Sequence, residues 1–410
     1  MVPSAGGGES PENRSESVDV AFTLDALRVP DTTSDSAHVR FEAARHADGA
    51  QPIEDRIVQA LVARGPASWV RMAATFSMTV NREYGVVIID TGADRVEVAP
   101  GREVFDLVRS LRNEAASTAQ GPWFRLALIA SPGVPVEIQT DDGTEPFVGP
   151  YLFDPADYRA DIAAYPGRDV PLWLVAYAFH DGAQHRPPAR AVAEHSRRSA
   201  DQIVVEADWP DLPVMWSRWA ALSAVSAARH ADFGPSIAPS LAVFEASSYD
   251  GSTLVRLPGD RAVLSGGLFG DPNLKAAYLA RAELPNLFAG APIWVTDATL
   301  SSRAIDGMLS FCWWYDGGRW YRAVESPQPS ACFSAVPAVT SAAETVGAIV
   351  KALTDTPSEL VTATANAYVA AVEDNMVTRT LVETLLPAAR GFDVDEALVS
   401  LAIAQSADLT

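Results

Sequence analysis

The pattern of apolar and polar residues between 53 and 180 predicts a domain in which helices alternate with short antiparallel strands. Ile53, Ile57 and Leu61 recur at helical spacing, and Gly65-Pro66 ends that run. Two further helices are expected at 104–111 and 153–165, and Arg109 and Arg112 are expected on the solvent side of the first of them. Strands are expected at 73–80, 84–90, 94–98, 123–129 and 134–140, where β-prone residues lie between turn signals. Helices that cover such a sheet make an α+β domain.

The pattern from 211 to 410 predicts a second α+β domain, so the fold class is two antiparallel sheets, each packed with helices. A helix begins near Leu212, strands follow at 241–247, 252–257, 261–264 and 292–296, and a short helix is expected at 272–279. The tail from Ser341 is expected to be helical, because Ser341 and Glu344 have capping-box spacing. Further helices are predicted at 358–372, 378–386 and 394–403.

Two other segments differ in composition from these domains. Residues 1–52 form a head and peripheral segment: 1–19 are rich in Gly, Ser, Glu and Pro and are expected to be disordered, whereas Val18, Val20, Phe22 and Leu24 alternate as in a short strand. Residues 181–210 are rich in Pro and Arg and are predicted to be a linker with a short helix.

Large rings gather in the stretch Ile305–Arg322, which reads IDGMLSFCWWYDGGRWYR. Gly317-Gly318 favours a tight turn between two strands, so the stretch predicts a β-hairpin. We expect Phe311 and Trp313 to be buried. The hairpin carries five large rings within nine positions, from Trp313 to Tyr321, which is more than one face of a sheet can bury. We therefore expect at least one ring to be partly exposed and to be a candidate contact for a partner: Trp314, Trp320 or Tyr321.

The charge of the chain restricts its partners. A formal net charge of −21 argues against nucleic acid and against an anionic membrane surface; it is explained by solubility alone or by a basic protein partner. Asp141, Asp142 and Glu145 form an acidic turn that is a candidate contact for such a partner, although turn chemistry alone also explains the motif. No signal-peptide core and no run of about 20 apolar residues is present, so a cytoplasmic protein is expected.

Residues that could carry chemistry are scattered rather than arranged in a motif. His180, His185 and His195 lie in the Pro- and Arg-rich stretch without metal-ligand spacing, and Ser265 lacks the Gly-x-Ser-x-Gly elbow. We therefore expect no catalytic set, no metal and no cofactor. Two cysteines, Cys312 and Cys332, are expected to be free and buried, with a single bridge between them as the alternative.

Several stretches between 54 and 179 resemble the YezG-like superfamily of bacterial immunity proteins, as found in actinobacterial proteins related to the tuberculosis necrotising toxin. The resemblance is carried by Trp69, by MAATFSMTV and YGVVIID, by EVFDLVRSLRNEAA and GPWFRLAL, and by FDPADYRADIAAYP with VPLWLVAY. It covers about a third of the chain and includes no chemical motif. A bias to Arg over Lys is typical of a GC-rich actinobacterial genome; only Lys275 and Lys351 are lysines.

The resemblance implies a non-enzymatic immunity or toxin-accessory protein that occludes its partner. The length departs from the family, because single-domain immunity proteins are much shorter. The alternative is a hydrolase or glycohydrolase-related enzyme with a site in the second domain around Ser265, Asp297 and the hairpin. A structural or export-related protein is a third reading. A deep polar pocket with two convergent ionisable groups would favour the enzyme.

Overall fold

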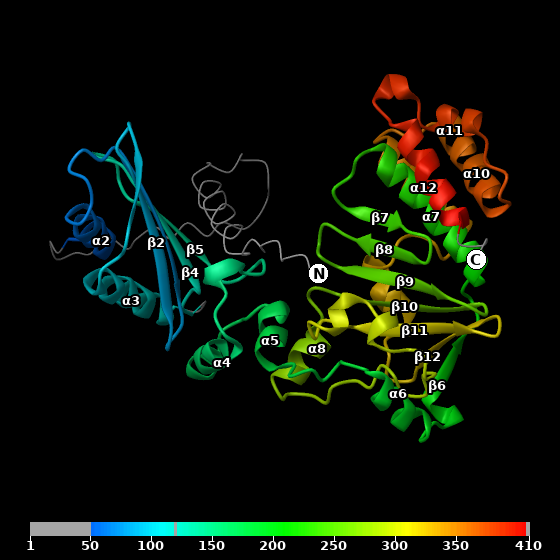
Figure 1. Ribbon diagram of the computed structural model, residues 1–410, viewed down its shortest axis with the longest axis horizontal. Coiled ribbons are helices and arrows are strands. Elements are labelled where there is room, and N and C mark those ends of the chain that lie inside the picture. Colours follow the sequence, from blue (N-terminus) through cyan, green and yellow to red (C-terminus); the bar gives the residue numbers. More distant parts are fainter. Residues whose placement is uncertain (1–50, 119–120, 407–410) are drawn as a thin grey trace, which may run out of the picture. The chain divides into compact units, whose positions relative to one another are not determined.

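The computed structural model describes residues 51–118 and 121–406, which divide into two compact units (Figure 1). One unit extends to Leu174 and the other begins at Val175. Each contains an antiparallel sheet packed with helices, and the chain ends in helices, so the predicted α+β class is confirmed. The predictions for the head at 1–50, including the strand at 18–27, lie outside the described residues.

The sheet of the first unit has the strand order β3-β2-β1-β4-β5 within the described residues. Its central strand, β1, pairs antiparallel with β2 and β4, and Thr79 N donates to Arg82 O at 2.8 Å in the turn between β1 and β2. The strands confirm the predicted order and are β1 (Arg71–Met78), β2 (Glu83–Asp90), β3 (Arg95–Val98), β4 (Arg125–Ala130) and β5 (Glu137–Asp141).

Two helices, α2 (Ile53–Val62) and α3 (Arg102–Ala116), lie together on one face of this sheet (Figure 1). Their apolar stripes meet the inward side chains of the strands, and Ile57, Val108 and Phe76 are fully buried in the shared core. The helices α4 (Pro155–Ala164) and α5 (Leu172–Phe179) follow. Strands β1 and β4 alternate buried residues, which face these two helices, with half-buried residues on the other face.

The sheet of the second unit has the strand order β6-β12-β11-β10-β9-β8-β7 within the described residues. The strand predicted at 292–296 is wrong: that stretch is a turn leading into a 3-10 helix, and its carbonyls accept hydrogen bonds from a buried arginine. The strands are β6 (Ile203–Glu206), β7 (Gly234–Ile237), β8 (Leu241–Glu245), β9 (Gly251–Leu257), β10 (Arg261–Gly267), β11 (Phe311–Asp316) and β12 (Arg319–Ala323).

The helix α7 (Leu212–Ala228) packs in the core of the second unit together with the C-terminal helices. The predicted capping box is present, since Ser341 Oγ accepts from Glu344 N at 3.2 Å and the Glu344 carboxylate accepts from Ser341 N. The remaining helices of this unit are α6 (Pro188–His195), α8 (Pro272–Tyr278), α9 (Ala342–Leu353), α10 (Glu359–Glu373), α11 (Arg379–Leu385) and α12 (Val394–Ser406). No helix in the described part of the chain combines the length and the apolar character needed to cross a bilayer.

The segment 181–210 is not a linker but part of the second unit. Its strand β6 pairs with β12, with Trp320 opposite Glu206. The guanidinium of Arg186 is fully buried, donates to the carbonyl oxygens of Pro292 and Val295, and forms an ion pair with Glu194 at 2.8 Å. A Pro- and Arg-rich composition suggested solvent exposure, but these contacts hold the segment in the fold.

The aromatic hairpin β11–β12 is packed on both faces. Phe311, Trp313, Tyr315 and Trp320 join the core that contains α7, whereas Trp314 packs with Phe288, Val295 and Leu309 on the other face. The predicted burial of Phe311 and Trp313 is confirmed. Trp314 and Trp320 are each 1% exposed and are corrected as contact candidates, because the loop around 287–309 covers Trp314 and the core that contains α7 encloses Trp320. Tyr321 is half-buried, which agrees with the expectation of one partly exposed ring.

Candidate protein-binding surface

The outer face of the five-stranded sheet is the face that α2 and α3 do not cover. Along β1, Met72, Ala74 and Phe76 are buried in the core, whereas Ala73 and Thr75 point to the other side and are half-buried. Strands β2 and β4 alternate in the same way. We call the outer centre the group Ala73, Thr75, Val86, Ile88, Ala127 and Ile129, all half-buried.

Strand register makes the outer centre continuous. Ala73 pairs with Ile88 on β2 and with Ile129 on β4. Paired residues on one face of neighbouring strands lie within about 5 Å of each other, so their side chains touch. The next row has the same arrangement: Thr75 stands between Val86 and Ala127. Methyl-rich side chains thus form two adjacent rows across three strands.

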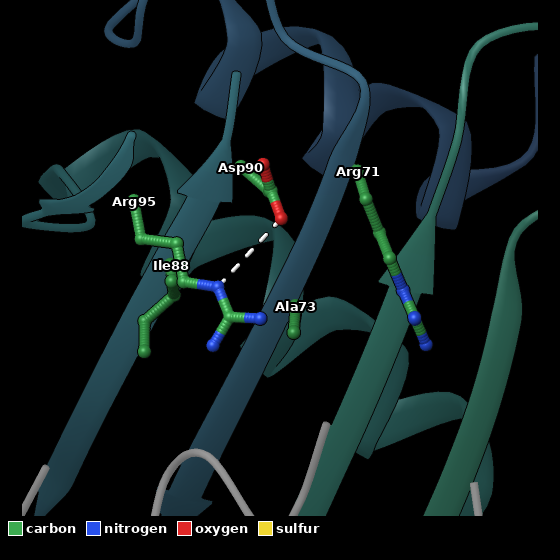
Figure 2. Close-up of a pocket in the computed structure, with 5 residues that line it drawn as sticks. All are labelled: Arg71, Ala73, Ile88, Asp90 and Arg95. Atoms are coloured by element: carbon green, nitrogen blue, oxygen red, sulfur yellow. Dashed lines mark ion pairs between the residues drawn. The ribbon is translucent and has the colours of Figure 1, made fainter. Parts of the chain in front are cut away.

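A charged row borders this centre at one end. Arg71 pairs with Asp90, and Asp90 pairs with Arg95, so the three side chains lie side by side on β1, β2 and β3 (Figure 2). Arg95 Nε is 3.6 Å from Asp90 Oδ2. Within the described residues the structure gives Arg71 no ion pair, although it lines the same small pocket as Asp90, Arg95, Ala73 and Ile88 (Figure 2). The row thus holds one carboxylate, which pairs with Arg95, and two guanidinium groups.

The lateral edges of the outer face carry acidic side chains. Glu97 on β3 is opposite Ile88, and Glu137 on β5 is opposite Ile129; both glutamates are exposed. The far corner is neutralised, because Arg125 Nη2 lies 2.5 Å from Asp141 Oδ2. The surface is therefore an apolar centre with a basic end and acidic sides. This composition is typical of an interface with an apolar core and a polar rim.

The predicted acidic turn lies at the end of β5 and is largely paired within the chain. Asp141 binds Arg125 and accepts from Gly143 N at 2.8 Å, and Asp142 forms an ion pair with Arg168 Nη2 at 3.2 Å. Burial raises the pKa of the Asp142 carboxyl, and the neighbouring Arg168 lowers it in part. Only Glu145 is exposed and has no ion pair within the described residues. The carboxylates of Asp141 and Asp142 are therefore engaged mainly in contacts within the chain.

Arg168 connects this turn to a buried network of ion pairs. Arg168 donates to Asp161 Oδ2 at 3.3 Å, and its guanidinium lies 3.4 Å from the ring centroid of Phe124. Burial lowers the pKa of Arg168 to about 10, against the opposing effect of Asp142. Arg112, which helical periodicity placed on the wet side of its helix, is 2% exposed and also binds Asp161. The prediction for Arg112 was wrong because Asp161, on a different helix, neutralises its charge inside the first unit.

Of the residues that would carry an enzyme in the second unit, Ser265 is buried and Asp297 is hydrogen-bonded within the chain. Ser265 is fully buried and its Oγ accepts from Ser301 N at 2.8 Å, which removes it from contact with a substrate. Asp297 accepts from Arg186 N at 2.6 Å and is 3.6 Å from His185 Nδ1, so it joins two loops. Within the described chain, no three His, Cys, Asp or Glu side chains are grouped as metal ligands.

Sequence reasoning found the acidic turn and the strands but missed the charged row and the outer centre. Their residues are far apart in the chain and become neighbours only through register, which a single sequence does not specify. The alternation in β1 and β2 was the available signal. Comparison with known proteins finds no matching family model, no similar curated protein and no similar solved structure.

Proposed function

We propose that the chain is a non-enzymatic protein-binding protein, of the immunity or accessory type in a bacterial polymorphic toxin system, that acts by occluding its partner. The observation that carries the proposal is the outer centre, an apolar sheet surface that no described helix covers. Apolar side chains that remain half-exposed gain free energy when a partner removes them from water, about 25 cal/mol per Å². The resemblance of residues 54–179 to YezG-like immunity proteins supports the same role.

The charges favour a basic partner. The chain carries a net charge of −21, which accelerates encounter with a basic protein. At the surface itself, Glu97 and Glu137 stand beside the outer centre and Glu145 is exposed near its far corner. We propose a partner whose apolar patch is bordered by Arg or Lys, such as a toxin with a positively charged active-site cleft. The binding would take place in the cytoplasm.

The test is binding of the product of a neighbouring gene to variants of the outer centre. Ala73→Arg places a charge in the middle of the apolar rows, and we expect its affinity to fall at least about tenfold. Ser110→Arg, on the exposed side of α3, is the matched control and should leave affinity unchanged. Equal affinities for the two variants, with a partner that binds the wild type, would reject this surface. Absence of any partner would reject the immunity role.

A further inference from the structure

We propose that the edge strand β3 (Arg95–Val98) is the interface through which a second copy of this chain extends the five-stranded sheet. In this arrangement the β3 strands of two copies pair antiparallel about a two-fold axis at Val96. The inference concerns the edge of the sheet and not its outer centre, so it goes beyond the proposed function and does not depend on it.

The backbone of β3 presents hydrogen-bonding groups to the open side of the sheet. Among the described strands, β3 is last in the order and pairs only with β2. Asp90 O accepts from Val70 N at 2.8 Å and therefore points toward β1. Opposite residues of an antiparallel pair either exchange both hydrogen bonds or make none, so the N–H and C=O of Arg95, opposite Asp90, point away from β2. Glu97 has the same orientation, because it lies two residues further along the strand.

The side chains of β3 are complementary in sign to those of a second β3. The strand reads RVEV, and Arg95, Val96 and Glu97 are all exposed. In an antiparallel pair centred on Val96, Arg95 of each copy lies opposite Glu97 of the other. These are also the residues whose backbone groups point outward. Each side of the axis therefore gains a pair of backbone hydrogen bonds and a cross-strand ion pair.

The second copy continues the charged row of the outer face. Arg71, Asp90 and Arg95 already lie side by side on β1, β2 and β3 (Figure 2). Glu97 of the second copy would stand next to Arg95, so that positive and negative side chains alternate across the junction. The surplus positive charge of the row is thereby neutralised.

Val96 supplies the contact on the face that α2 and α3 cover. Its side chain is 37% exposed in a single copy and lies opposite Ile89, which is fully buried. At the axis the two copies of Val96 form a non-hydrogen-bonded pair, in which the Cα atoms are about 4.5 Å apart. The pairing thus removes an exposed apolar side chain of each copy from water.

The other described edge strands do not offer the same pairing. In β5, an antiparallel pair centred on the strand would place Glu137 opposite Asp141, and like charges on an edge prevent pairing. In the second unit, β7 contains Pro235, which lacks an N–H, and the only charged residue of β6 is Glu206. Of these edges, β3 is the one with opposite charges at positions that a two-fold axis brings together.

The overall charge and the outer centre are both compatible with this pairing. The net charge of −21 opposes association, but charges more than about 8 Å apart are largely screened at physiological ionic strength. Both outer centres stay exposed on one continuous face, so a second copy and a partner protein do not compete. The pairing neutralises Glu97, and Glu137 and Glu145 remain for a basic partner.

Charge reversal tests the pairing, with sedimentation equilibrium of the full-length chain and no partner present. We expect the wild type to dimerise, and Arg95→Glu and Glu97→Arg each to weaken dimerisation at least about tenfold, because each variant opposes like charges on both sides of the axis. An equimolar mixture of the two variants should form a heterodimer about as tightly as the wild type dimerises, since an acidic strand then faces a basic one. Glu114→Arg, exposed near the end of α3, is the matched control and should leave dimerisation unchanged.

Val96→Cys tests the register independently. Oxidation should give a covalent dimer, because the axis places this position opposite its own copy within disulfide range. The natural cysteines are buried, and Ser110→Cys, exposed on α3, should not cross-link under the same conditions.

Four results would overturn the proposal: a wild type that is monomeric at about 1 mM, a dimer that survives both charge reversals, a mixture of the two variants that stays monomeric, or no cross-link through position 96. Since no partner is used, each of these results leaves the proposed binding function standing.

Discussion

Arg112 donates through Nη2 to both carboxylate oxygens of Asp161, at 2.9 and 2.8 Å, although the two residues belong to different helices. Both side chains are almost completely buried. The same carboxylate accepts from Val80 N at 2.8 Å, directly after β1. One charge pair thus connects α3, α4 and the end of the central strand in the first unit.

Asp161→Asn should destabilise the first unit by about 3–5 kcal/mol, because it leaves the buried guanidinium of Arg112 without a counter-charge and Arg168 with Asp142 alone. Urea unfolding followed by circular dichroism measures the change. Asp90→Asn is the matched control: Asp90 is 34% exposed, and an Asn can still accept from Gly92 N. We expect the control to cost less than about 1 kcal/mol. Equal losses of unfolding free energy in the two variants would show that the buried Arg112–Asp161 pair stabilises the fold no more than the exposed Asp90–Arg95 pair does.

Trp320→Ala should destabilise the second unit by about 3–5 kcal/mol, since the ring is 1% exposed and its Nε1 donates to Pro210 O at 2.9 Å. Tyr321→Ala should cost clearly less, because Tyr321 is half-buried, although its ring stacks on Trp314. Thermal unfolding of both variants provides the comparison. A larger loss for Tyr321→Ala would contradict the assignment of Trp320 to the core.

The natural cysteines should be silent in the folded protein. Cys312 and Cys332 are free and fully buried, and burial raises the pKa of each thiol to about 12. A colourimetric thiol assay should detect neither in native protein and both after denaturation without reductant, since only the thiolate reacts. Ser110→Cys supplies an exposed thiol as the positive control. Finding no thiol after denaturation would instead indicate the bridge that the structure does not contain.

His180 should make stability depend on pH below neutrality. Burial lowers its pKa from 6.5, nearby His185 lowers it further, and Asp181 and Asp306 oppose the shift. The unfolded chain therefore binds more protons than the folded one between the lowered pKa and 6.5, so the free energy of unfolding falls as pH drops through that window. Neutral His180 Nδ1 also accepts from Gly182 N at 3.1 Å, a bond that protonation breaks.

The variant His180→Asn tests this dependence, because an Asn side chain can accept the same hydrogen bond but does not titrate. Free energies of unfolding measured at pH 7.5 and pH 5 should differ less in the variant than in the wild type. A pH dependence identical in both proteins would assign the effect to other groups.

Local pattern was sufficient for most of the fold. The helix from Ile53, the hairpin at Gly317-Gly318 and the capping box at Ser341 each depend on residues within a few positions, and each is present. Segments whose structure depends on distant partners were missed. β6 is a strand because β12 lies beside it, and residues 292–296 are irregular because Arg186 binds their carbonyl groups.

The candidate surface was harder to predict for the same reason. Asp141 and Asp142 were recognised from their turn motif, but their partners Arg125 and Arg168 are 16 and 26 residues away. The rows of the outer centre join residues from three strands, and a shift of one residue in register would place them in the core instead. The buried state of Trp314 depends on the loop around 287–309, whose position local periodicity does not specify.

The position of Arg186 determines where the chain can be divided for separate production of its second half. A fragment that begins at Leu212 would lack β6, so β12 would become an open edge strand prone to pair with other chains. It would also lack Arg186, whose guanidinium donates to the carbonyl oxygens of Pro292 and Val295. Gln184, which hydrogen-bonds to both the N–H and the C=O of Leu309, would be missing as well. A soluble fragment must therefore begin before Gln184, well upstream of the point that composition suggests.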